Sequence, residues 1–297
     1  MGKSLLSQSA PSVLVLCVNY HNDRDTVAFV KGLLALEASD QLQIVVVDNS
    51  VREFPEPKLD SLSSSDPRVR VLHPKRNLGY FGGAAWGLRQ HLSAAPLTDW
   101  VVVANTDISF PDYDVLTRLS RLPKGESPVI APAIRSNLSG TDQNPYMSKR
   151  PSGVRMHFYK WVFRYYPLFV IYHQLSAAKQ KITALFHSSG RSASGSGEAK
   201  EAQRQPIYAP HGAFMIFHRS YFQAGGSFDY AVFLFGEEIF VAETVRRLGL
   251  TVMYEPSLVV VHREHATTGS RSRQIAKYAA EASAYCADQY FGAKFKV

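Results

Sequence analysis

Short apolar runs that end in polar residues are the clearest pattern along this chain. Residues 13–18, 43–47 and 100–104 are rich in β-branched side chains, and asparagine or aspartate follows each run at once. Runs of this length and composition predict buried strands. Between them, residues 26–38 and 81–95 carry apolar side chains at helical spacing. This alternation predicts an α/β fold with a mostly parallel central sheet, flanking helices and right-handed crossovers.

The second half of the chain continues the alternation. Strands are expected at 212–218, 250–254 and 258–262, and helices at 239–248 and 274–291. No apolar run reaches the length of a membrane span, and the first twelve residues lack the apolar region of a signal peptide, so neither element is expected. Cys17 and Cys286 lie far apart and are expected to be packed free thiols in a reducing compartment.

Polar side chains stand where three of the predicted strands end. They are Asn19, Asp48 and Asp107. One such residue alone is usually a helix cap or a turn residue, but three on successive strands favour a ligand site, because ligands bind at the carboxyl ends of strands in open α/β sheets. The carboxylate of Asp107 suits a hard divalent cation, which in turn suits a diphosphate.

A glycine-rich segment precedes the predicted helix at 81–95. Gly79, Gly82 and Gly83 would let the backbone approach a ligand closely, and the start of the helix favours an anion. The segment matches neither the dinucleotide-binding fingerprint nor the phosphate-binding P-loop, so it does not predict either cofactor class.

Two adjacent acids come just before the predicted helix at 239–248. Glu237 and Glu238 complement the positive end of the helix dipole. Alternatively, their mutual repulsion raises one pKa and makes a general base, which takes a proton from a sugar hydroxyl. His262 ends a predicted strand; such a histidine is usually structural, but it becomes a second metal ligand if it faces Asp107.

The net charge of +8 is concentrated in one segment. Residues 143–197 contain eight basic side chains and no acidic one, whereas the rest of the chain carries 25 of each sign. The segment also carries apolar side chains at helical spacing, interrupted by Pro167. The two predicted stripes are Phe158, Trp161, Val162 and Tyr165, followed by Leu168, Ile171, Tyr172, Leu175, Ile182 and Leu185.

Two basic amphipathic helices are typical of an element that lies on an anionic membrane surface, here through residues 149–191. A helical hairpin packed on the domain is the main alternative. Binding of nucleic acid fits less well, because the ordered apolar periodicity disfavours an RNA-binding arm. Residues 188–205 are poor in apolar side chains and rich in serine, glycine and alanine, so a flexible loop is expected there.

Seven short motifs in a fixed order resemble the family 2 glycosyltransferases of the GT-A fold. They are VNYHN, VVVDNS, RNLGYFGG, ANTDI, GAFMIFHRSYFQAGGSFD, FLFGEEI and VVVH. The resemblance spans roughly residues 12–135 and 207–265 and is strongest to bacterial rhamnosyl- and galactofuranosyltransferases of surface polysaccharide synthesis. It implies one domain over 1–297, with a nucleotide-sugar half at 12–135, a basic aromatic insert and loop at 143–205, and an acceptor and catalytic half at 206–297.

The resemblance also implies roles for single residues. Those that would bind the nucleotide sugar are Asn19, Tyr20, Asn22, Asp48, Asn49, Arg76, Asn77, Gly79, Gly82, Gly83, Asn105 and Asp107. In the family's metal motif, Asn105 and Thr106 depart from the usual residues, and Asp107 would hold Mg²⁺ or Mn²⁺ with His262. Glu238 would be the base by position, with Glu237 as the alternative. The further acid that often follows is Phe240 here. His211 and Gly212 would border the acceptor pocket.

The implied activity is an inverting, metal-dependent transfer of a sugar from dTDP-rhamnose or a UDP-sugar to a glycan or a polyprenyl-diphosphate-linked acceptor. The implied location is the cytoplasm or the inner face of the cytoplasmic membrane. A nucleotidyltransferase usually has a glycine-rich loop with lysine after the first strand, which residues 19–24 lack. A non-catalytic module that binds nucleotide sugars or membranes is the other alternative. The transferase hypothesis requires Asp107 and Glu238 to lie at the same site.

Overall fold

The computed structural model describes residues 12–54, 56–123, 127–175, 202–264 and 272–292. The chain divides into two compact units, each of which is described by itself. The larger unit consists of residues 1–150, 204–233 and 237–267, and the smaller unit of residues 151–203, 234–236 and 268–297.

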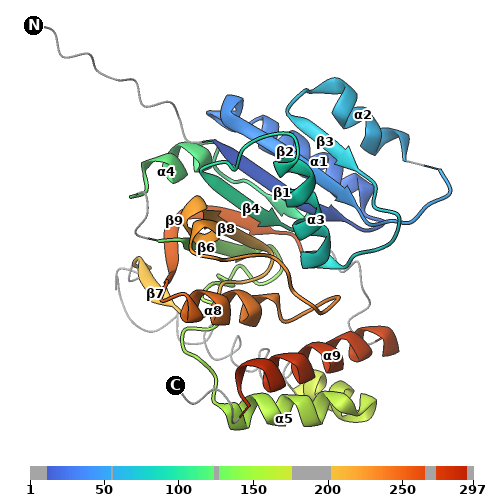
Figure 1. Cartoon of the computed structure of the whole chain (residues 1–297), viewed down its shortest axis with the longest axis vertical. Coiled ribbons are helices and arrows are strands. Elements are labelled where there is room, and N and C mark those ends of the chain that lie inside the picture. Colours follow the sequence, from blue (N-terminus) through green and yellow to red (C-terminus); the bar gives the residue numbers. More distant parts are fainter. Residues whose placement is uncertain (1–11, 55, 124–126, 176–201, 265–271, 293–297) are drawn as a thin grey trace, which may run out of the picture. The chain divides into compact units, whose positions relative to one another are not determined.

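Among its described residues, the larger unit has one mixed sheet of nine strands (Figure 1). The strands are β1 (Val13–Asn19), β2 (Leu42–Asp48), β3 (Val69–Leu72), β4 (Trp100–Ala104), β5 (Ile108–Ser109), β6 (Val129–Ser136), β7 (Gln205–Ile207), β8 (Phe214–His218) and β9 (Val252–His262). Their order is β3-β2-β1-β4-β8-β6-β9-β5, and β7 pairs with β9.

The first four strands are parallel, as the sequence predicts. β1 pairs with β2 and β4, and β2 pairs with β3. Antiparallel pairs enter with β8, which lies between β4 and β6 and runs opposite to both. The observed fold is therefore α/β with a mixed sheet. Its first four strands are parallel and alternate with helices, and β6 and β9 form a further parallel pair.

The strands predicted separately at 250–254 and 258–262 are in fact one strand, β9. Its partner β6 changes register between Pro132, which lies opposite Glu255, and Ala133, which lies opposite Val259. The polar residues and proline at 255–257 interrupt the apolar run and suggest a turn, but an irregularity in the ladder absorbs them. The strand continues to His262 without a break.

Helices cover both faces of this sheet. They are α1 (Asp23–Leu34), α2 (Pro57–Ser65), α3 (Tyr80–Leu92), α4 (Val115–Arg121), α7 (Arg219–Gln223) and α8 (Glu237–Arg247), with a short 3₁₀ turn η1 (Ser39–Gln41). Phe29 of α1 and Leu59 of α2 share a buried cluster with Val15 of β1. On the opposite face, Gly87 of α3 lies against Val47 of β2.

Two of these helices differ in length from the prediction. The helix expected at 26–38 is α1, which ends at Leu34, and the one expected at 81–95 is α3, which ends at Leu92. The alanine-rich ends match helical spacing, but of residues 35–38 only Leu36 packs in the core, and residues 93–95 are largely exposed. Little packing is therefore left to stabilise further helical turns.

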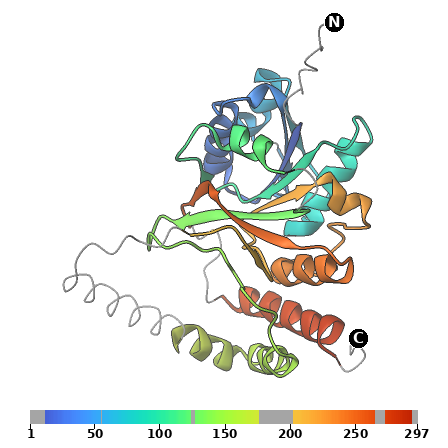
Figure 2. The same ribbon diagram turned by 90° about the vertical axis from the view of Figure 1, so that its left-hand side faces the viewer.

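The smaller unit contains α5 (Gly153–Arg164) and α9 (Arg273–Tyr290), which pack along each other (Figure 2). α9 confirms the helix predicted at 274–291. A second helical stretch covers 166–175, so the predicted break falls at Tyr165, and Pro167 occupies the first turn of the new helix. Ile182, Leu185 and most of the predicted loop at 188–205 lie outside the described residues, but Gln205 itself begins β7.

Two further predictions about the chain are tested by the structure. Cys17 and Cys286 are buried free thiols, as predicted. In the described ranges, none of the helices has the length and hydropathy that would let it cross a bilayer.

Candidate active site

The ends of β1, β2 and β4 lie at one edge of the sheet. Asn19 is opposite Asp48 in the register of β1 with β2, and Cys17 is opposite Ala104 in the register of β1 with β4. The chain that leaves β4 therefore passes through residues 105–107 at the edge where β1 and β2 end. This is the edge at which open α/β sheets bind ligands.

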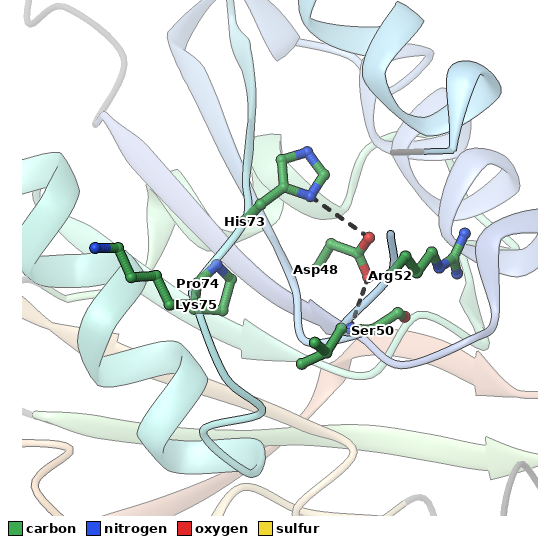
Figure 3. A pocket seen from close by; sticks show the side chains of 7 residues that line it. Asp48, Ser50, Arg52, His73, Pro74 and Lys75 are labelled. Carbon is green, nitrogen blue, oxygen red and sulfur yellow. Dashed lines mark hydrogen bonds and ion pairs between the residues drawn. The ribbon is translucent and has the colours of Figure 1, made fainter. Parts of the chain in front are cut away.

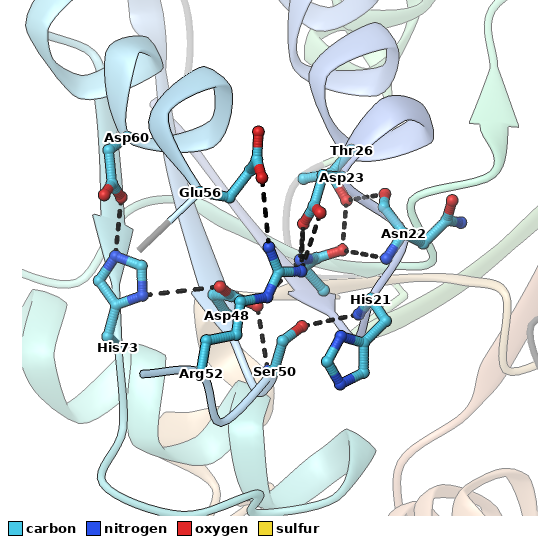
Figure 4. Close-up of polar contacts among 11 residues, drawn as sticks. His21, Asn22, Asp23, Thr26, Asp48, Ser50, Arg52, Glu56, Asp60 and His73 are labelled. Carbon is cyan, nitrogen blue, oxygen red and sulfur yellow. Dashed lines mark hydrogen bonds and ion pairs between the residues drawn. The ribbon is translucent and has the colours of Figure 1, made fainter. Parts of the chain in front are cut away.

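Asn19 makes its side-chain hydrogen bonds inside the protein, with partners that Figure 4 labels: Asn22, Asp23, Thr26 and Asp48. Its Nδ2 donates to Asp23 at 2.8 Å and to Asp48 at 2.9 Å, and its Oδ1 accepts from the backbone of Asn22 at 3.2 Å and the hydroxyl of Thr26 at 2.9 Å. Four bonds use the capacity of an amide side chain. In this arrangement Asn19 holds Asp48 in place, and its amide has no group left for a nucleotide.

A pocket opens beside the end of β2 (Figure 3). Its lining consists of Asp48, Ser50, Val51, Arg52, His73, Pro74 and Lys75. Only 2% of Asp48 is exposed, and its Oδ2 lies 3.6 Å from Nδ1 of His73. His73 also pairs with Asp60, and Arg52 donates to both oxygens of Asp23. Each carboxylate here has a basic neighbour, and sequence reasoning missed His73 because the short strand β3 that leads to it was not predicted.

Three predicted nucleotide-binding residues, Tyr20, Asn22 and Arg76, lie near the same end of the sheet. Tyr20 is 47% exposed, and its ring meets that of His21 edge-on. Asn22 precedes α1 without a side-chain cap, and Arg76 is exposed. Their binding roles stay predictions.

The glycine-rich segment is fixed by protein contacts. Asn49 donates to the carbonyl of Gly79 at 2.8 Å and accepts from the backbone of Leu78 at 3.3 Å, while Asn77 accepts from the backbone of Gly79 at 2.9 Å. Gly79 has a φ of +75°, and an added Cβ would collide with the carbonyl of Phe233. Glycine at this position is therefore required by the protein's own backbone.

The other two glycines of the segment differ from each other. A Cβ on Gly83 would lie 3.1 Å from Val18, so this glycine allows α3 to pack closely on β1. At Gly82 the nearest atom would be Cβ of Leu78 at 3.6 Å, which is ordinary contact. Close approach of a ligand stays a prediction for Gly82.

Asp107 and His262 face each other across the pair of β5 and β9. Only 7% of Asp107 is exposed, and its Oδ1 lies 3.3 Å from Nε2 of His262. The pairing of Ile108 with His262 brings them together, because it places the end of β9 beside the residue that follows Asp107. The geometric condition for His262 as a second metal ligand is met.

His211 lies beside this pair. Its ring centroid is 5.9 Å from that of His262, its backbone N–H donates to Asn144, and its Nδ1 accepts from the backbone of Ala213 at 3.1 Å. The pKa of His211 is lowered to about 4, chiefly by burial and also by the charge of His262, and the charge of Asp107 offsets part of the shift. His211 is therefore neutral at neutral pH, with its proton on Nε2.

Glu238 reaches the same place through Gly212. A Cβ on Gly212 would lie 2.8 Å from Oε1 of Glu238, so glycine makes room for this carboxylate. Burial raises the pKa of Glu238, and hydrogen bonds from its own backbone N–H and that of Gly212 offset only part of the rise. A carboxylate with a raised pKa is suited to accepting a proton.

Tyr80 lies within reach of the charges of three acids. Its hydroxyl donates to the carbonyl of Gly212 at 2.9 Å. Burial raises the pKa of Tyr80 well above its usual value, and the charges of Glu237, Glu238 and Asp107 raise it further. The charges of Asp107 and Glu238 thus both act on Tyr80, and their place in one site stays a prediction. Tyr80 lies in the RNLGYFGG motif, but the predicted binding residues in this motif are its neighbours and not Tyr80 itself.

The donor set fits a divalent cation. Nowhere in the described part of the chain do three histidine, cysteine, aspartate or glutamate side chains gather in a metal-binding group. Asp107 and His262 supply two donors, a carboxylate that suits Mg²⁺ and an imidazole that Mn²⁺ also accepts. The remaining ligands would have to come from a diphosphate and water.

The family model for glycosyl transferase family 2 matches residues 12–186, more than half of the chain. The chain belongs to this family. Two curated relatives are the N-acetylglucosaminyl-diphospho-decaprenol L-rhamnosyltransferases of Mycobacterium tuberculosis strains CDC 1551 / Oshkosh and ATCC 25618 / H37Rv. Each is 24% identical over 238 residues, which cover 76% of this glycosyltransferase and 69% of the relative.

The GalNAc-T7 structure agrees on the fold. The crystal structure of GalNAc-T7 with UDP, GalNAc and Mn²⁺ aligns with a TM-score of 0.55 at 13% identity, and the alignment covers 86% of this chain but only 44% of that one. The mannosyltransferase PcManGT from Pyrobaculum calidifontis, in complex with GDP-Man and Mn²⁺, aligns with a TM-score of 0.49 at 14% identity over 96% of this chain and 77% of its own. This family 2 glycosyltransferase has the predicted GT-A fold.

Proposed function

We propose that this glycosyltransferase moves a sugar from a nucleoside-diphosphate donor, dTDP-rhamnose or a UDP-sugar, to a lipid-linked glycan acceptor with inversion at the anomeric carbon. The observation that carries the proposal is the gathering of Asp107, His262 and Glu238 around residues 211–212. The relatives' name supports the acceptor class, since it specifies N-acetylglucosaminyl-diphospho-decaprenol. On this proposal the enzyme acts in the synthesis of a bacterial surface polysaccharide.

Asp107 and His262 would hold a divalent cation, Mg²⁺ or Mn²⁺. When bound, such an ion neutralises the charge that develops on the leaving diphosphate. Mn²⁺ in the GalNAc-T7 structure supports this assignment. The pocket beside Asp48 and His73 would take the nucleoside, because it lies at the same edge of the sheet and offers both acceptors and donors.

Glu238 is the proposed base, with Glu237 as the alternative. Its carboxylate accepts the proton of the acceptor hydroxyl as that oxygen attacks the anomeric carbon. Attack from the face opposite the leaving diphosphate inverts the configuration, through a transition state of oxocarbenium character. His211 and Gly212 would border the acceptor, because they lie between Glu238 and the pair of Asp107 and His262.

The test of the proposal is Mn²⁺-dependent binding of nucleoside-diphosphate sugars. Binding is measured as a thermal shift across a panel of donors. We expect Asp107→Asn to abolish the dependence on Mn²⁺. Asp229→Asn is the matched control, because the carboxylate of Asp229 forms an exposed ion pair with Arg89. Binding by Asp107→Asn that still responds to Mn²⁺ as in the wild type would remove Asp107 from the site.

We further propose that the smaller unit docks on an anionic bilayer at the inner face of the cytoplasmic membrane. One side of α5 presents a stripe spaced four, three and four residues apart, with exposed fractions of 82, 51, 56 and 47% for Val154, Phe158, Trp161 and Tyr165. Exposed Arg155 and Arg164 lie at its two ends. Apolar side chains of this kind enter the interface, while cations meet anionic headgroups.

Flotation with vesicles tests the docking. We expect binding to vesicles rich in phosphatidylglycerol and little binding to pure phosphatidylcholine, with loss at high salt. Trp161→Ser together with Phe158→Ser should abolish flotation, whereas Leu92→Ser on α3, which is 45% exposed, should not. Flotation that ignores lipid charge, or that survives the double substitution, contradicts the proposal.

A further inference from the structure

Three polar side chains form a line that ends at Asp107. Oε1 of Glu264 accepts from Nε2 of Gln143 at 3.1 Å. Oε1 of Gln143 lies 2.9 Å from Nδ1 of His262. Nε2 of His262 lies 3.3 Å from Oδ1 of Asp107. The line connects the loop after β6 and the end of β9 to the proposed metal site.

The carboxylate of Glu264 sets the donor and acceptor of each hydrogen bond between Glu264, Gln143 and His262. An ionised carboxylate only accepts hydrogen bonds, so the NH₂ group of Gln143 must face Glu264. The carbonyl oxygen of Gln143 therefore faces His262, and since a carbonyl also only accepts, Nδ1 of His262 must carry a hydrogen. In the neutral ring the lone pair is then on Nε2, which is the nitrogen nearest Asp107.

The backbone holds Gln143 in place. Its N–H donates to the carbonyl of Ile134 on β6 at 2.8 Å. The preceding residue, Asp142, accepts from the backbone of Ile134 at 2.9 Å and from that of Asn144 at 2.9 Å. Because these hydrogen bonds fix the backbone around Gln143, its side chain can orient His262 with little further loss of conformational freedom.

The neighbouring histidine, His211, shows that each tautomer here is set by the hydrogen-bond partner of its own ring. Nδ1 of His211 accepts a hydrogen bond from the backbone of Ala213, so its proton is on Nε2. Two imidazoles 5.9 Å apart therefore carry their protons on different nitrogens. A lone pair of His262 that faces a carboxylate oxygen is an arrangement of two acceptors, which suits a cation between them.

We infer that Glu264 and Gln143 are positioning residues that hold His262 as the Nδ1–H tautomer, so that Nε2 is available to a divalent cation. The part that concerns the cation rests on the proposed function, whereas the tautomer does not. Outer partners of this kind fix the orientation of metal-binding histidines and raise their basicity in general.

The tautomer is measured in the metal-free protein by long-range ¹H–¹⁵N spectra of ¹⁵N-histidine-labelled enzyme, about two pH units above the ordinary histidine pKa. His262→Asn assigns the resonance. We expect the wild type to carry the proton on Nδ1 and Gln143→Leu to shift it toward Nε2. Gln41→Leu is the matched control, because Gln41 donates to a carboxylate, that of Asp40, and lies on η1.

The same variants are compared for Mn²⁺ affinity in the presence of UDP. Gln143→Leu should weaken Mn²⁺ binding about 10- to 100-fold, and Gln41→Leu should not change it. The double variant Gln143→Glu with Glu264→Gln should restore both the tautomer and the affinity. In it, the new amide at 264 donates to the new carboxylate at 143, which still accepts from Nδ1.

The outcomes separate the two proposals. A wild-type His262 with its proton on Nε2, or an unchanged tautomer in Gln143→Leu, overturns the positioning role. Unchanged Mn²⁺ affinity in Gln143→Leu, when His262→Asn loses it, overturns the effect on the metal. Unchanged affinity in His262→Asn overturns the proposed metal role of His262 itself, and the spectra then decide the tautomer alone.

Discussion

Helix α8 carries two glutamates whose pKa values shift in opposite directions, Glu238 in its first turn and Glu243 in its middle. Glu238 meets the backbone N–H groups of Gly212 and its own residue, and burial raises its pKa. Burial by itself would also raise the pKa of Glu243, which is 1% exposed. There, however, donation from Arg150 at 2.6 Å, from Tyr208 at 2.7 Å and from Arg246 at 3.0 Å outweighs the effect of burial and lowers the pKa.

The opposite pKa shifts suit the two carboxylates to different roles. A group with few donors is basic and reactive, whereas a group with three donors, two of them cationic, is held in its ionised form. Glu243 ties α8 to the segment after β6 through Arg150 and to the segment before His211 through Tyr208. The helix that Glu243 ties down is also the one that carries Glu238 beside Gly212.

The largest expected effect separates the two glutamates by activity. Glu238→Gln should lower kcat for sugar transfer about 10³-fold and leave donor affinity within about twofold, because the amide cannot take a proton. Glu243→Gln should retain turnover at a temperature where it stays folded. The measurement is steady-state transfer with the donor found by thermal shift. Normal turnover in Glu238→Gln, with loss in Glu237→Gln, would move the base to Glu237.

The second effect tests the anchor. Arg150→Met leaves the charge of Glu243 buried with fewer partners, and we expect a loss of about 3 kcal/mol in the free energy of unfolding. Urea denaturation measures it. Arg89→Met, which breaks the exposed pair with Asp229, serves as control and should cost no more than about 1 kcal/mol. Equal losses in both variants would mean that Glu243 is not an anchor.

The third effect is the acid sensitivity of the fold. The pKa of Glu243 in the folded protein is below its unfolded value, so its contribution to stability is present above about pH 4.3 and is lost as the pH falls through the folded pKa. Glu243→Gln should therefore be less stable than the wild type at neutral pH, and the gap should close toward low pH. Unfolding free energies measured between pH 3 and pH 8 check this, and a gap that is constant across the range would contradict it.

The smallest effect has the opposite sign. The pKa of Glu238 is raised on folding, so its contribution to stability is present below the unfolded pKa and is lost as the pH rises through the folded value. At neutral pH, Glu238→Gln should be as stable as the wild type or more stable, by about 1 kcal/mol or less. A clear destabilisation at pH 7 would show that the ionised carboxylate of Glu238 supports the fold.

The elements that the sequence predicts well are those with a local signature. β1, β2 and β4 are short, largely apolar runs rich in β-branched side chains, and the helices between them have apolar faces. β6 was missed because Pro132 argues against a central strand. The strand tolerates Pro132 because the register with β9 shifts directly after it.

The candidate site divides in the same way. The strand-end acids Asp48 and Asp107 are visible as motifs, because a short buried run followed by a carboxylate is a pattern of adjacent residues. Tyr80 and Gln143 were missed because their partners are far along the chain. Tyr80 meets Gly212 across 132 positions, and Gln143 meets His262 across 119.

The sequence by itself determined the alternating strands and helices, the polar residues at the strand ends and the family of this glycosyltransferase. Only the tertiary structure decided that the amide of Asn19 is used up inside the protein, that Glu238 and Glu243 have opposite pKa shifts, and which nitrogen of His262 faces Asp107. Periodicity is a property of neighbouring residues, whereas hydrogen-bond capacity, burial and tautomer depend on groups that meet only after the chain has folded.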